Sequence, residues 1–329
     1  MITTTQLKIQ VYNWVNNEYM DACLRELHAH LDCQELDPDG DLNEQLRGVE
    51  MVIDIGGHAS REIIDAAADA KFWQIIGTGL DACEVQYILD KGSRLGNTPG
   101  FTSALALSEC AMMYILMLTR KYHQARDNFQ SGIFGIPNGK TLDQMTLGII
   151  GFGASGRQLA KRAKSFGMRI EAIDIRPLDA DLPKDMQPDF YGLSDEMDSV
   201  ISRSDVVSLH LHLTPETRHI IDDRRLGLMK SSAFLINVAR GALVDEDALA
   251  EAILGGKIAG AGIDVFASEP ADASRPEYQL PNFIATPHTS GQTDETIRRR
   301  CAIAVDNARR LAAGEELLHL IDAGMGLGK

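Results

Sequence analysis

Three polar residues with complementary chemistry each follow an apolar segment in the second half of the chain. Arg240 comes after FLINVA, Glu269 after GIDVFAS and His288 after FIATP. Arginine offers a planar fork of donors that matches a carboxylate, and histidine exchanges a proton near neutral pH. A glutamate on the second imidazole nitrogen would fix the tautomer and stabilise the imidazolium. Such a set suits a carbonyl beside a carboxylate, which is the arrangement in a 2-oxo acid.

Each of these residues has an ordinary structural alternative when it is taken singly. Arg240 could be a solvated surface charge, and Glu269 and His288 could be loop residues beside a proline. Their shared position after successive predicted strands favours a site instead, because the carboxyl ends of parallel strands border the ligand crevice of an open sheet. We therefore expect the three side chains to meet at that edge.

A glycine-rich segment, LGIIGFGASGRQLA, lies between an apolar strand pattern and an amphipathic helix pattern. It places Gly151, Gly153 and Gly156 in G-x-G-x-x-G spacing. In this context the glycines permit a tight turn, a close approach of backbone amides to a pyrophosphate, and close packing of helix on strand. The helix N-terminus then favours the anion. The alternative is a plain glycine-rich turn, but the complete context favours dinucleotide binding.

The acidic residue that should follow this loop is also present. Asp174 ends the predicted strand RIEAIDI, eighteen positions after Gly156. A carboxylate there accepts hydrogen bonds from the adenosine ribose and repels a 2′-phosphate, whereas the nearby Arg176 could tolerate that phosphate. We expect NAD as the cofactor, ahead of NADP.

Short apolar strand patterns alternate with helical patterns along most of the 329 residues, which predicts an α/β fold with parallel sheets. Strands are predicted at residues 7–14, 49–56 and 72–79, and a second series starts at MTLGIIGFG. A long apolar helix is predicted near residues 108–125. The two series indicate two doubly wound domains with a boundary near residues 105–140.

Composition narrows the class of protein further. No apolar run is long enough to span a bilayer, and the N-terminal segment lacks the features of a signal peptide, so we expect a cytoplasmic protein without a membrane partner. The net charge of −15 disfavours nucleic-acid binding, which needs a basic face. The five cysteines are scattered and never form CxxC, which argues against disulfides and against a metal site.

Four segments together resemble the D-isomer-specific 2-hydroxyacid dehydrogenases. They are GIIGFGASG, INVARGALVDEDAL, GIDVFASEP and TPH, and the likeness runs from about Gly77 to about Ala313. The resemblance implies a Rossmann NAD-binding domain over residues 106–289 and a flavodoxin-like substrate (catalytic) domain formed by residues 1–105 and 290–329. It also implies a homodimer, for which the long apolar helix from Ser108 and the loop around Phe134 are suited.

The resemblance implies roles for individual residues at the substrate. Arg240 would bind the substrate carboxylate, together with the backbone amides of Thr78 and Gly79. His288 would be the acid–base, with Glu269 as its partner. The implied activity is reversible hydride transfer between NAD(H) and a small D-2-hydroxy acid or 2-oxo acid, such as glyoxylate or hydroxypyruvate.

The resemblance implies further residues at the cofactor. Asp264 would hold the nicotinamide carboxamide. Additional contacts are expected from Ala154, Ser155, His210, Thr217, Val238, Ala239 and Gly291. One departure from the family pattern is His212, which stands where a proline is usual and could alter the loop against the cofactor.

Two other functions remain open from the sequence. A phosphoglycerate dehydrogenase would need basic residues at the substrate loops, which offer few beyond Arg61 and Arg94. A non-catalytic NAD(H)-sensing protein of the corepressor type would use the same fold for assembly and could retain the same polar residues. Turnover of a 2-oxo acid would separate an enzyme from a sensor.

Overall fold

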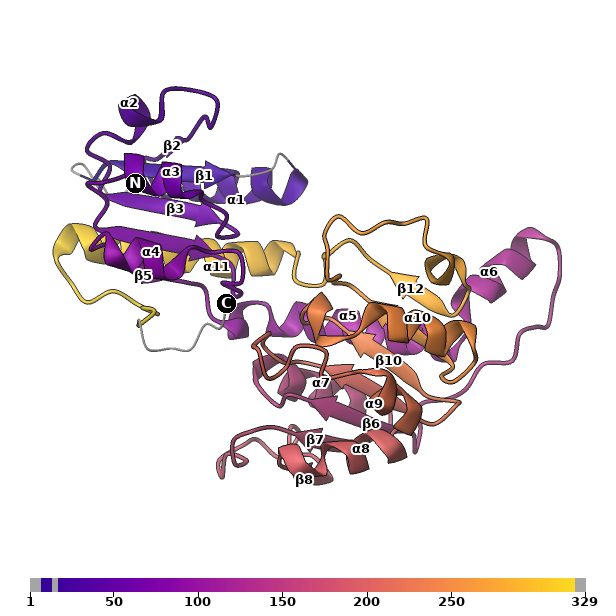
Figure 1. Ribbon diagram of the computed structural model, residues 1–329. Helices are drawn as coiled ribbons and strands as arrows, with labels where there is room; N and C mark the ends of the chain where they lie inside the picture. Colours follow the sequence, from indigo (N-terminus) through magenta and orange to yellow (C-terminus); the bar gives the residue numbers. More distant parts are fainter. Residues whose placement is uncertain (1–6, 14–16, 323–329) are drawn as a thin grey trace. The chain divides into compact units, whose positions relative to one another are not determined.

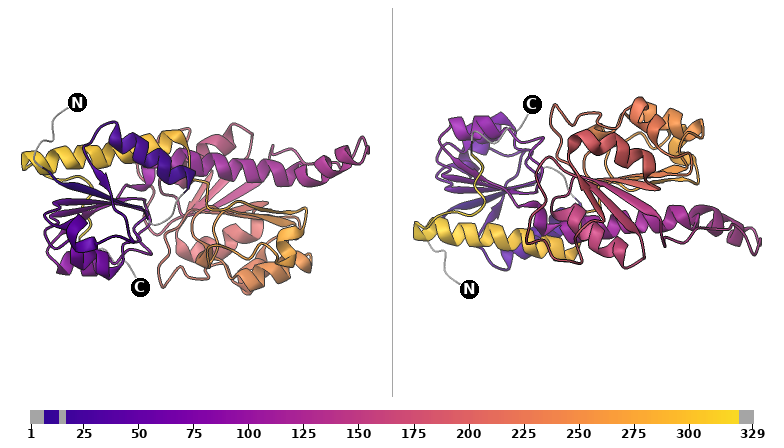
Figure 2. Two further views of the ribbon diagram at one scale, coloured as in Figure 1. Left: turned by 90° about the horizontal axis from the view of Figure 1, so that it is seen from above. Right: turned by 90° about the horizontal axis from the view of Figure 1, so that it is seen from below.

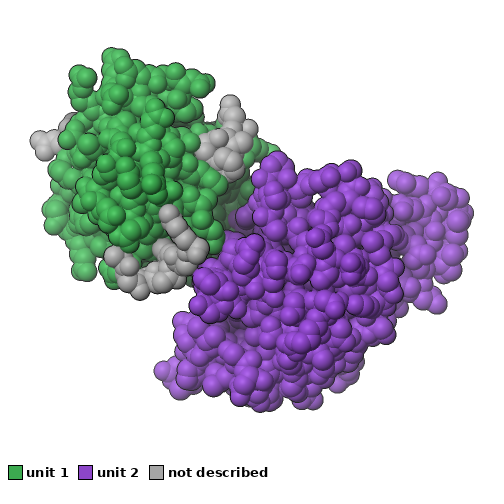
Figure 3. Space-filling view, in the orientation of Figure 1, with its two compact units in different colours: residues 1–102, 292–329 green, residues 103–291 purple. Residues whose placement is uncertain are grey.

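The computed structural model describes residues 7–13 and 17–322. The chain divides into two compact units, which are coloured separately in Figure 3. Unit 1 comprises residues 1–102 and 292–329, and unit 2 comprises residues 103–291. The expected boundaries after residues 105 and 289 differ from these by three and two residues. Each unit is built around one sheet.

The sheet of unit 1 has the strand order β2-β1-β3-β4-β5, and every strand pair is parallel. This is a flavodoxin-like order, in which the chain winds first to one side of the sheet and then to the other. Its strands are β1 (Ile9–Asn13), β2 (Gln34–Glu35), β3 (Met51–Ile55), β4 (Phe72–Ile76) and β5 (Arg94–Gly96). Trp14, the expected end of β1, lies outside the described residues.

Helices cover both faces of this sheet (Figures 1 and 2). One face packs against α1 (Glu18–His28) and α11 (Asp294–Ala313), so the end of the chain returns to the unit that contains its beginning. The other face packs against α2 (Leu42–Leu46), α3 (Arg61–Ala66) and α4 (Val85–Asp90). The central strands β3 and β4 are completely buried and mostly apolar, as expected of parallel strands that are covered on both faces.

The sheet of unit 2 has the order β12-β11-β10-β9-β6-β7-β8, again with parallel pairs. The chain order reverses between β6 and β9, which is the switch point of a Rossmann fold. The strands are β6 (Thr146–Ile150), β7 (Arg169–Ile173), β8 (Phe190–Gly192), β9 (Val206–Leu209), β10 (Phe234–Asn237), β11 (Gly260–Ile263) and β12 (Phe283–Ala285). The predicted α/β class with two parallel sheets is confirmed.

Two layers of helices enclose the second sheet. One face is covered by α5 (Ala104–Thr119) and α7 (Ala154–Lys164), and the other by α8 (Met197–Arg203), α9 (Asp223–Leu228) and α10 (Glu246–Leu254). Single 3₁₀ turns complete the two units: η1 (Gly100–Thr102), η2 (Ser194–Glu196), η3 (Gly241–Leu243) and η4 (Pro276–Gln279).

The long helix expected at residues 108–125 is divided in the structure. α5 ends at Thr119, and α6 (Tyr122–Gln130) begins after Lys121, which has a left-handed backbone with φ of 51°. A helix cannot continue through such a residue, and the sequence carries no glycine there to signal the break. No residue of α6 is buried, and Figure 1 shows this helix standing away from the sheet of unit 2. Within the described part of the chain, no helix has both the length and the apolar character needed to cross a membrane.

Candidate active site

The glycine loop after β6 has the geometry of a phosphate-binding turn. Gly151 has φ of 94°, and a Cβ there would lie 2.5 Å from the carbonyl oxygen of His210. A Cβ at Gly156 would lie 2.3 Å from the Gly151 oxygen. These two glycines are therefore required by the chain itself. Gly153 differs, because a Cβ there would meet no described atom within 4 Å. A missing side chain in open space suits the approach of a ligand.

The start of α7 offers positive polarity at this turn. Gly153 is the N-cap residue and has no side chain to satisfy the first N–H groups of the helix. The first turn contains no acidic residue. Free N–H groups at a helix N-terminus bind anions such as a pyrophosphate. The loop and helix therefore fit the phosphates of a dinucleotide.

Asp174 lies directly beside this loop. Its Oδ2 accepts a hydrogen bond from the Phe152 N–H at 2.7 Å, and its Oδ1 accepts one from the Arg176 N–H at 3.2 Å. The Arg176 guanidinium forms an ion pair with the same carboxylate at 3.6 Å but is 73% exposed. The acid therefore lies at the glycine loop, with the more exposed arginine on its solvent side, and its contact with an adenosine ribose stays a prediction.

His210 connects the end of β9 to the start of α7. Its Nδ1 is 3.0 Å from the Ser155 hydroxyl, and its Nε2 is 3.0 Å from the Ser208 hydroxyl. Burial lowers the pKa of His210 to about 3, so the ring is neutral. A neutral ring donates through one nitrogen and accepts through the other. His210 therefore fixes the orientation of Ser155, and its expected contact with a cofactor stays a prediction.

Arg240 is placed by a turn that follows β10. Asn237 is 1% exposed, accepts from the Ala239 N–H at 3.1 Å and donates to the Arg240 carbonyl at 2.9 Å. A Cβ at Gly241 would lie 1.9 Å from the carbonyl carbon of Phe266. Glycine is therefore needed behind the arginine, because the backbone carrying Arg240 passes directly against the segment that leads to Glu269.

Glu269 and His288 form a hydrogen-bonded pair. The Nδ1 of His288 is 2.8 Å from Oε2 of Glu269, and the Phe266 N–H donates to Oε1 at 2.9 Å. Burial opposes ionisation of Glu269, but the hydrogen bonds from His288 and Phe266 and the charge of Arg240 outweigh it and hold the pKa of this carboxyl below its ordinary value. The carboxylate is thus ionised and can stabilise an imidazolium.

The three residues expected to converge are brought together in unit 2. Glu269 contacts His288 directly and feels the charge of Arg240. Their elements explain this arrangement, because the three residues follow β10, β11 and β12, which are neighbours in the sheet. The site places a guanidinium near a hydrogen-bonded carboxylate–imidazole pair at the carboxyl ends of the strands, where the ligand crevice of an open parallel sheet lies.

The other expected residues lie in several places. Val238 and Ala239 belong to the turn before Arg240, and Gly291 is the last residue of unit 2. The Thr217 hydroxyl accepts from the Thr214 N–H at 2.8 Å and so helps to shape its own loop. Thr78 and Gly79 lie in unit 1, in the loop after β4. The binding roles of these residues stay predictions.

Sequence reasoning did not identify several polar residues that form hydrogen bonds around the site. Asn237 holds the Arg240 turn. Tyr114 and Thr286 form a hydrogen-bonded pair beside Asp264, although they are 172 positions apart in the chain. Asn237 could have been found from its place as a polar residue ending an apolar strand. Tyr114 gave no such signal, because it lies within an apolar helix pattern.

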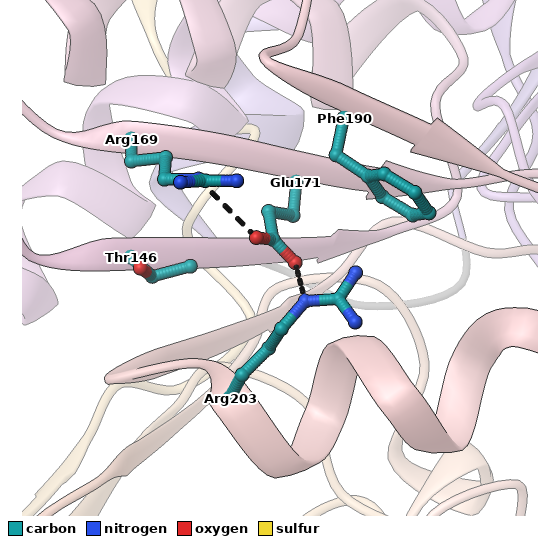
Figure 4. A pocket seen from close by; sticks show the side chains of 5 residues that line it. All are labelled: Thr146, Arg169, Glu171, Phe190 and Arg203. Carbon is teal, nitrogen blue, oxygen red and sulfur yellow. Dashed lines mark hydrogen bonds and ion pairs between the residues drawn. The ribbon is translucent and has the colours of Figure 1, made fainter.

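A hollow at the opposite edge of the same sheet is occupied by protein charges (Figure 4). Glu171 is 2% exposed and pairs with Arg203 at 2.5 Å and Arg169 at 3.3 Å. The guanidinium of Arg203 also lies 4.7 Å from the ring centre of Phe190. The charged side chains pair with one another, so the hollow is lined by structural ion pairs. Across the described residues, no cluster of His, Cys, Asp or Glu is arranged to hold a metal ion.

The fold and the site thus define a dinucleotide-binding α/β protein with an Arg–Glu–His set. Residues 112–290 match the family description "D-isomer specific 2-hydroxyacid dehydrogenase, NAD binding domain". The chain belongs to the D-isomer-specific 2-hydroxyacid dehydrogenase family.

Relatives with a named activity cover most of the chain. A hydroxypyruvate reductase of Thermotoga maritima is 37% identical over 253 residues, which are 76% of this chain and 80% of that protein. Glyoxylate/hydroxypyruvate reductase B of Pectobacterium carotovorum is 34% identical over 90% of this chain and 92% of its own length. The structure of D-lactate dehydrogenase from Aquifex aeolicus, complexed with NAD and lactic acid, matches with a TM-score of 0.78 and 25% identity, covering 94% of this chain and 96% of that one.

Proposed function

We propose that this protein is an NAD-dependent oxidoreductase that interconverts a small 2-oxo acid and the corresponding D-2-hydroxy acid, with reduction of glyoxylate or hydroxypyruvate as its main reaction. The observation that carries the proposal is the pairing of His288 with an ionised Glu269 within reach of the Arg240 charge. Relatives that act on hydroxypyruvate and glyoxylate support this substrate class.

In the proposed reaction, each residue of the site has a separate role in substrate binding or in proton transfer. NADH, when bound, supplies the hydride that is transferred to the carbonyl carbon. Arg240 holds the substrate carboxylate with its planar donors and adds positive charge beside the oxygen on which negative charge develops. Glu269 engages Nδ1 of His288, so the Nε2 atom delivers the proton to that oxygen. In the oxidising direction the same nitrogen accepts the proton from the hydroxyl.

A substrate panel tests the proposal directly. NADH consumption, followed by absorbance, should be observed with glyoxylate, hydroxypyruvate, pyruvate or longer 2-oxo acids. Phosphohydroxypyruvate should be a poorer substrate, because the loops expected at the substrate offer few basic residues beyond Arg61 and Arg94. Tight NADH binding without turnover of any acid would overturn the enzymatic assignment and favour an NAD(H) sensor.

The cofactor preference should depend on Asp174. Asp174→Asn keeps an oxygen to accept from the Phe152 N–H but removes the charge that repels a 2′-phosphate and pairs with Arg176. We expect the ratio of kcat/KM for NADPH to that for NADH to rise about tenfold or more. Steady-state kinetics with both cofactors measure this ratio. Asp185→Asn, which breaks a surface pair with Lys161, should leave it unchanged. An unaltered ratio in Asp174→Asn would show that Asp174 does not select NAD.

We infer that the protein forms a homodimer through the arm made by α6 and residues 131–139. Phe129 and Phe134 contact each other edge to face and are 70% and 78% exposed, and Ile136 is 57% exposed. Such a group of exposed apolar side chains marks an interaction surface. Light scattering should give about twice the chain mass of 36.0 kDa. Phe134→Asp should shift the protein towards monomer, whereas Phe166→Asp should not, although Phe166 is also exposed. A monomeric wild type would exclude this interface.

A further inference from the structure

Tyr114 of α5 is a buried residue that the proposed mechanism does not use. It is 0% exposed and lies in the apolar layer between α5 and the sheet. A Cβ at Gly262 in β11 would lie 2.6 Å from the Cβ and the Cγ of this tyrosine. The side chain is therefore packed against bare backbone of β11, which fixes the position of the ring.

The hydroxyl group of Tyr114 begins a chain of hydrogen bonds. It contacts the Thr286 hydroxyl, and Thr286 in turn donates to Oδ1 of Asp264. Since Thr286 has only one hydroxyl proton and donates it to the carboxylate, Tyr114 must be the donor to Thr286. Burial raises the pKa of Tyr114 above its ordinary value, so the phenol keeps its proton at neutral pH.

Asp264 connects this chain to the loop that carries His288. Its carboxylate is completely buried and accepts from the Thr289 N–H at 2.8 Å and from the Ser290 N–H at 2.9 Å. Its carbonyl oxygen accepts from the His288 N–H, also at 2.8 Å. The loop from Thr286 to Ser290 is thus tied to one aspartate on both sides of the histidine.

The backbone of His288 needs this support. Its φ is 55°, in the left-handed region that residues other than glycine adopt at a cost. Such a conformation persists only where the surrounding contacts hold it. The Nδ1 contact with Glu269 at 2.8 Å depends on the same backbone geometry.

We propose that Tyr114 is a positioning residue for His288, acting through Thr286 and Asp264. The inference rests on the proposed function, in which His288 exchanges the proton. The phenol donates to Thr286, which orients the threonine hydroxyl towards Asp264, and the oriented carboxylate holds the amides on the far side of His288. A helix on one face of the sheet thereby fixes the acid–base residue at the edge. A ring that served only to fill the core would need no hydroxyl.

Removal of one oxygen atom separates positioning from packing. Tyr114→Phe keeps the ring against Gly262 and deletes the donor to Thr286. We expect kcat to fall on the order of tenfold, while the Kd for NADH stays within about twofold of the wild type. Amide hydrogen exchange of the loop from Thr286 to Ser290 should become faster. Tyr87→Phe, which deletes the exposed hydrogen bond from the Tyr87 phenol to Asp65, is the matched control. It should change neither kcat nor the amide exchange of this loop.

Variants of Thr286 test the connection itself. Thr286→Val should reproduce the effects of Tyr114→Phe, and the double variant should be no worse than the more impaired single variant, because both break the same chain. Thr286→Ser keeps the hydroxyl and should restore most of the activity. Wild-type kcat together with wild-type loop exchange in Tyr114→Phe would overturn the proposal. If the wild-type protein turned over no acid, the exchange measurements would still decide whether Tyr114 holds the loop.

Discussion

Replacement of His288 by glutamine should reduce kcat for 2-oxo acid reduction by at least about 100-fold, the usual contribution of a positioned acid–base group. Glutamine retains a polar amide of similar reach, so it can still contact Glu269, but it cannot deliver a proton. The Kd for NADH should stay close to that of the wild type, because the side chain is not part of the glycine loop or of the Asp174 region. Steady-state kinetics and NADH fluorescence titration measure the two quantities.

The two directions of the reaction provide a second measurement. The same side chain donates the proton in reduction and accepts it in oxidation, so its loss should impair both directions. Because the glutamine amide does neither, His288→Gln should be slow in 2-oxo acid reduction and in 2-hydroxy acid oxidation alike. His30→Gln removes an exposed histidine of unit 1 and should behave as the wild type in both directions. Unchanged turnover in His288→Gln would remove His288 from the mechanism.

The sequence could predict the convergence of Arg240, Glu269 and His288 because it depends on a general property of parallel sheets. Each residue follows a strand, and β10, β11 and β12 are adjacent, so their carboxyl ends meet at one edge. The glycine loop could also be predicted, because the spaced glycines, the preceding strand and the following helix are contiguous in the chain. A motif of this kind can be predicted from the sequence because all of its interacting parts lie within one short segment of the chain.

Tyr114 shows where sequence reasoning ends. Within an apolar helix pattern, a tyrosine reads as one more core residue. Its hydroxyl partner, Thr286, is 172 positions away, and the space for its ring is provided by Gly262 on a third element. Only the packing of α5 against β11 brings the three together. The break between α5 and α6 is likewise not marked in the sequence, because Lys121, which is not a glycine, adopts the left-handed backbone there.

Arg240→Ala should lower kcat/KM for the 2-oxo acid by on the order of 100-fold or more, through a higher KM from the lost carboxylate contact and a lower kcat from the lost charge beside the reacting oxygen. Loss of one partner of a hydrogen-bonded charge pair costs this much when the other charge must still be bound in the site. Arg240→Lys should be intermediate, because an ammonium keeps the charge but lacks the planar fork that matches a carboxylate. The order wild type, lysine, alanine would therefore report bidentate binding, whereas equal activity of the lysine variant would indicate that charge alone is sufficient.

Cofactor binding decides whether Arg240 acts on the substrate or on the fold. Asn237 holds the turn through the Arg240 carbonyl and the Ala239 N–H, both of them backbone groups that the alanine variant retains, although the variant loses the bond from Arg240 Nη1 to the Ala239 carbonyl. The turn should therefore survive, and the Kd for NADH should change little. Arg224→Ala, which removes an exposed guanidinium paired with Asp198, controls for loss of positive charge on unit 2. A parallel loss of NADH affinity and substrate affinity in Arg240→Ala would instead make the arginine a structural residue, and the carboxylate would need another binding group.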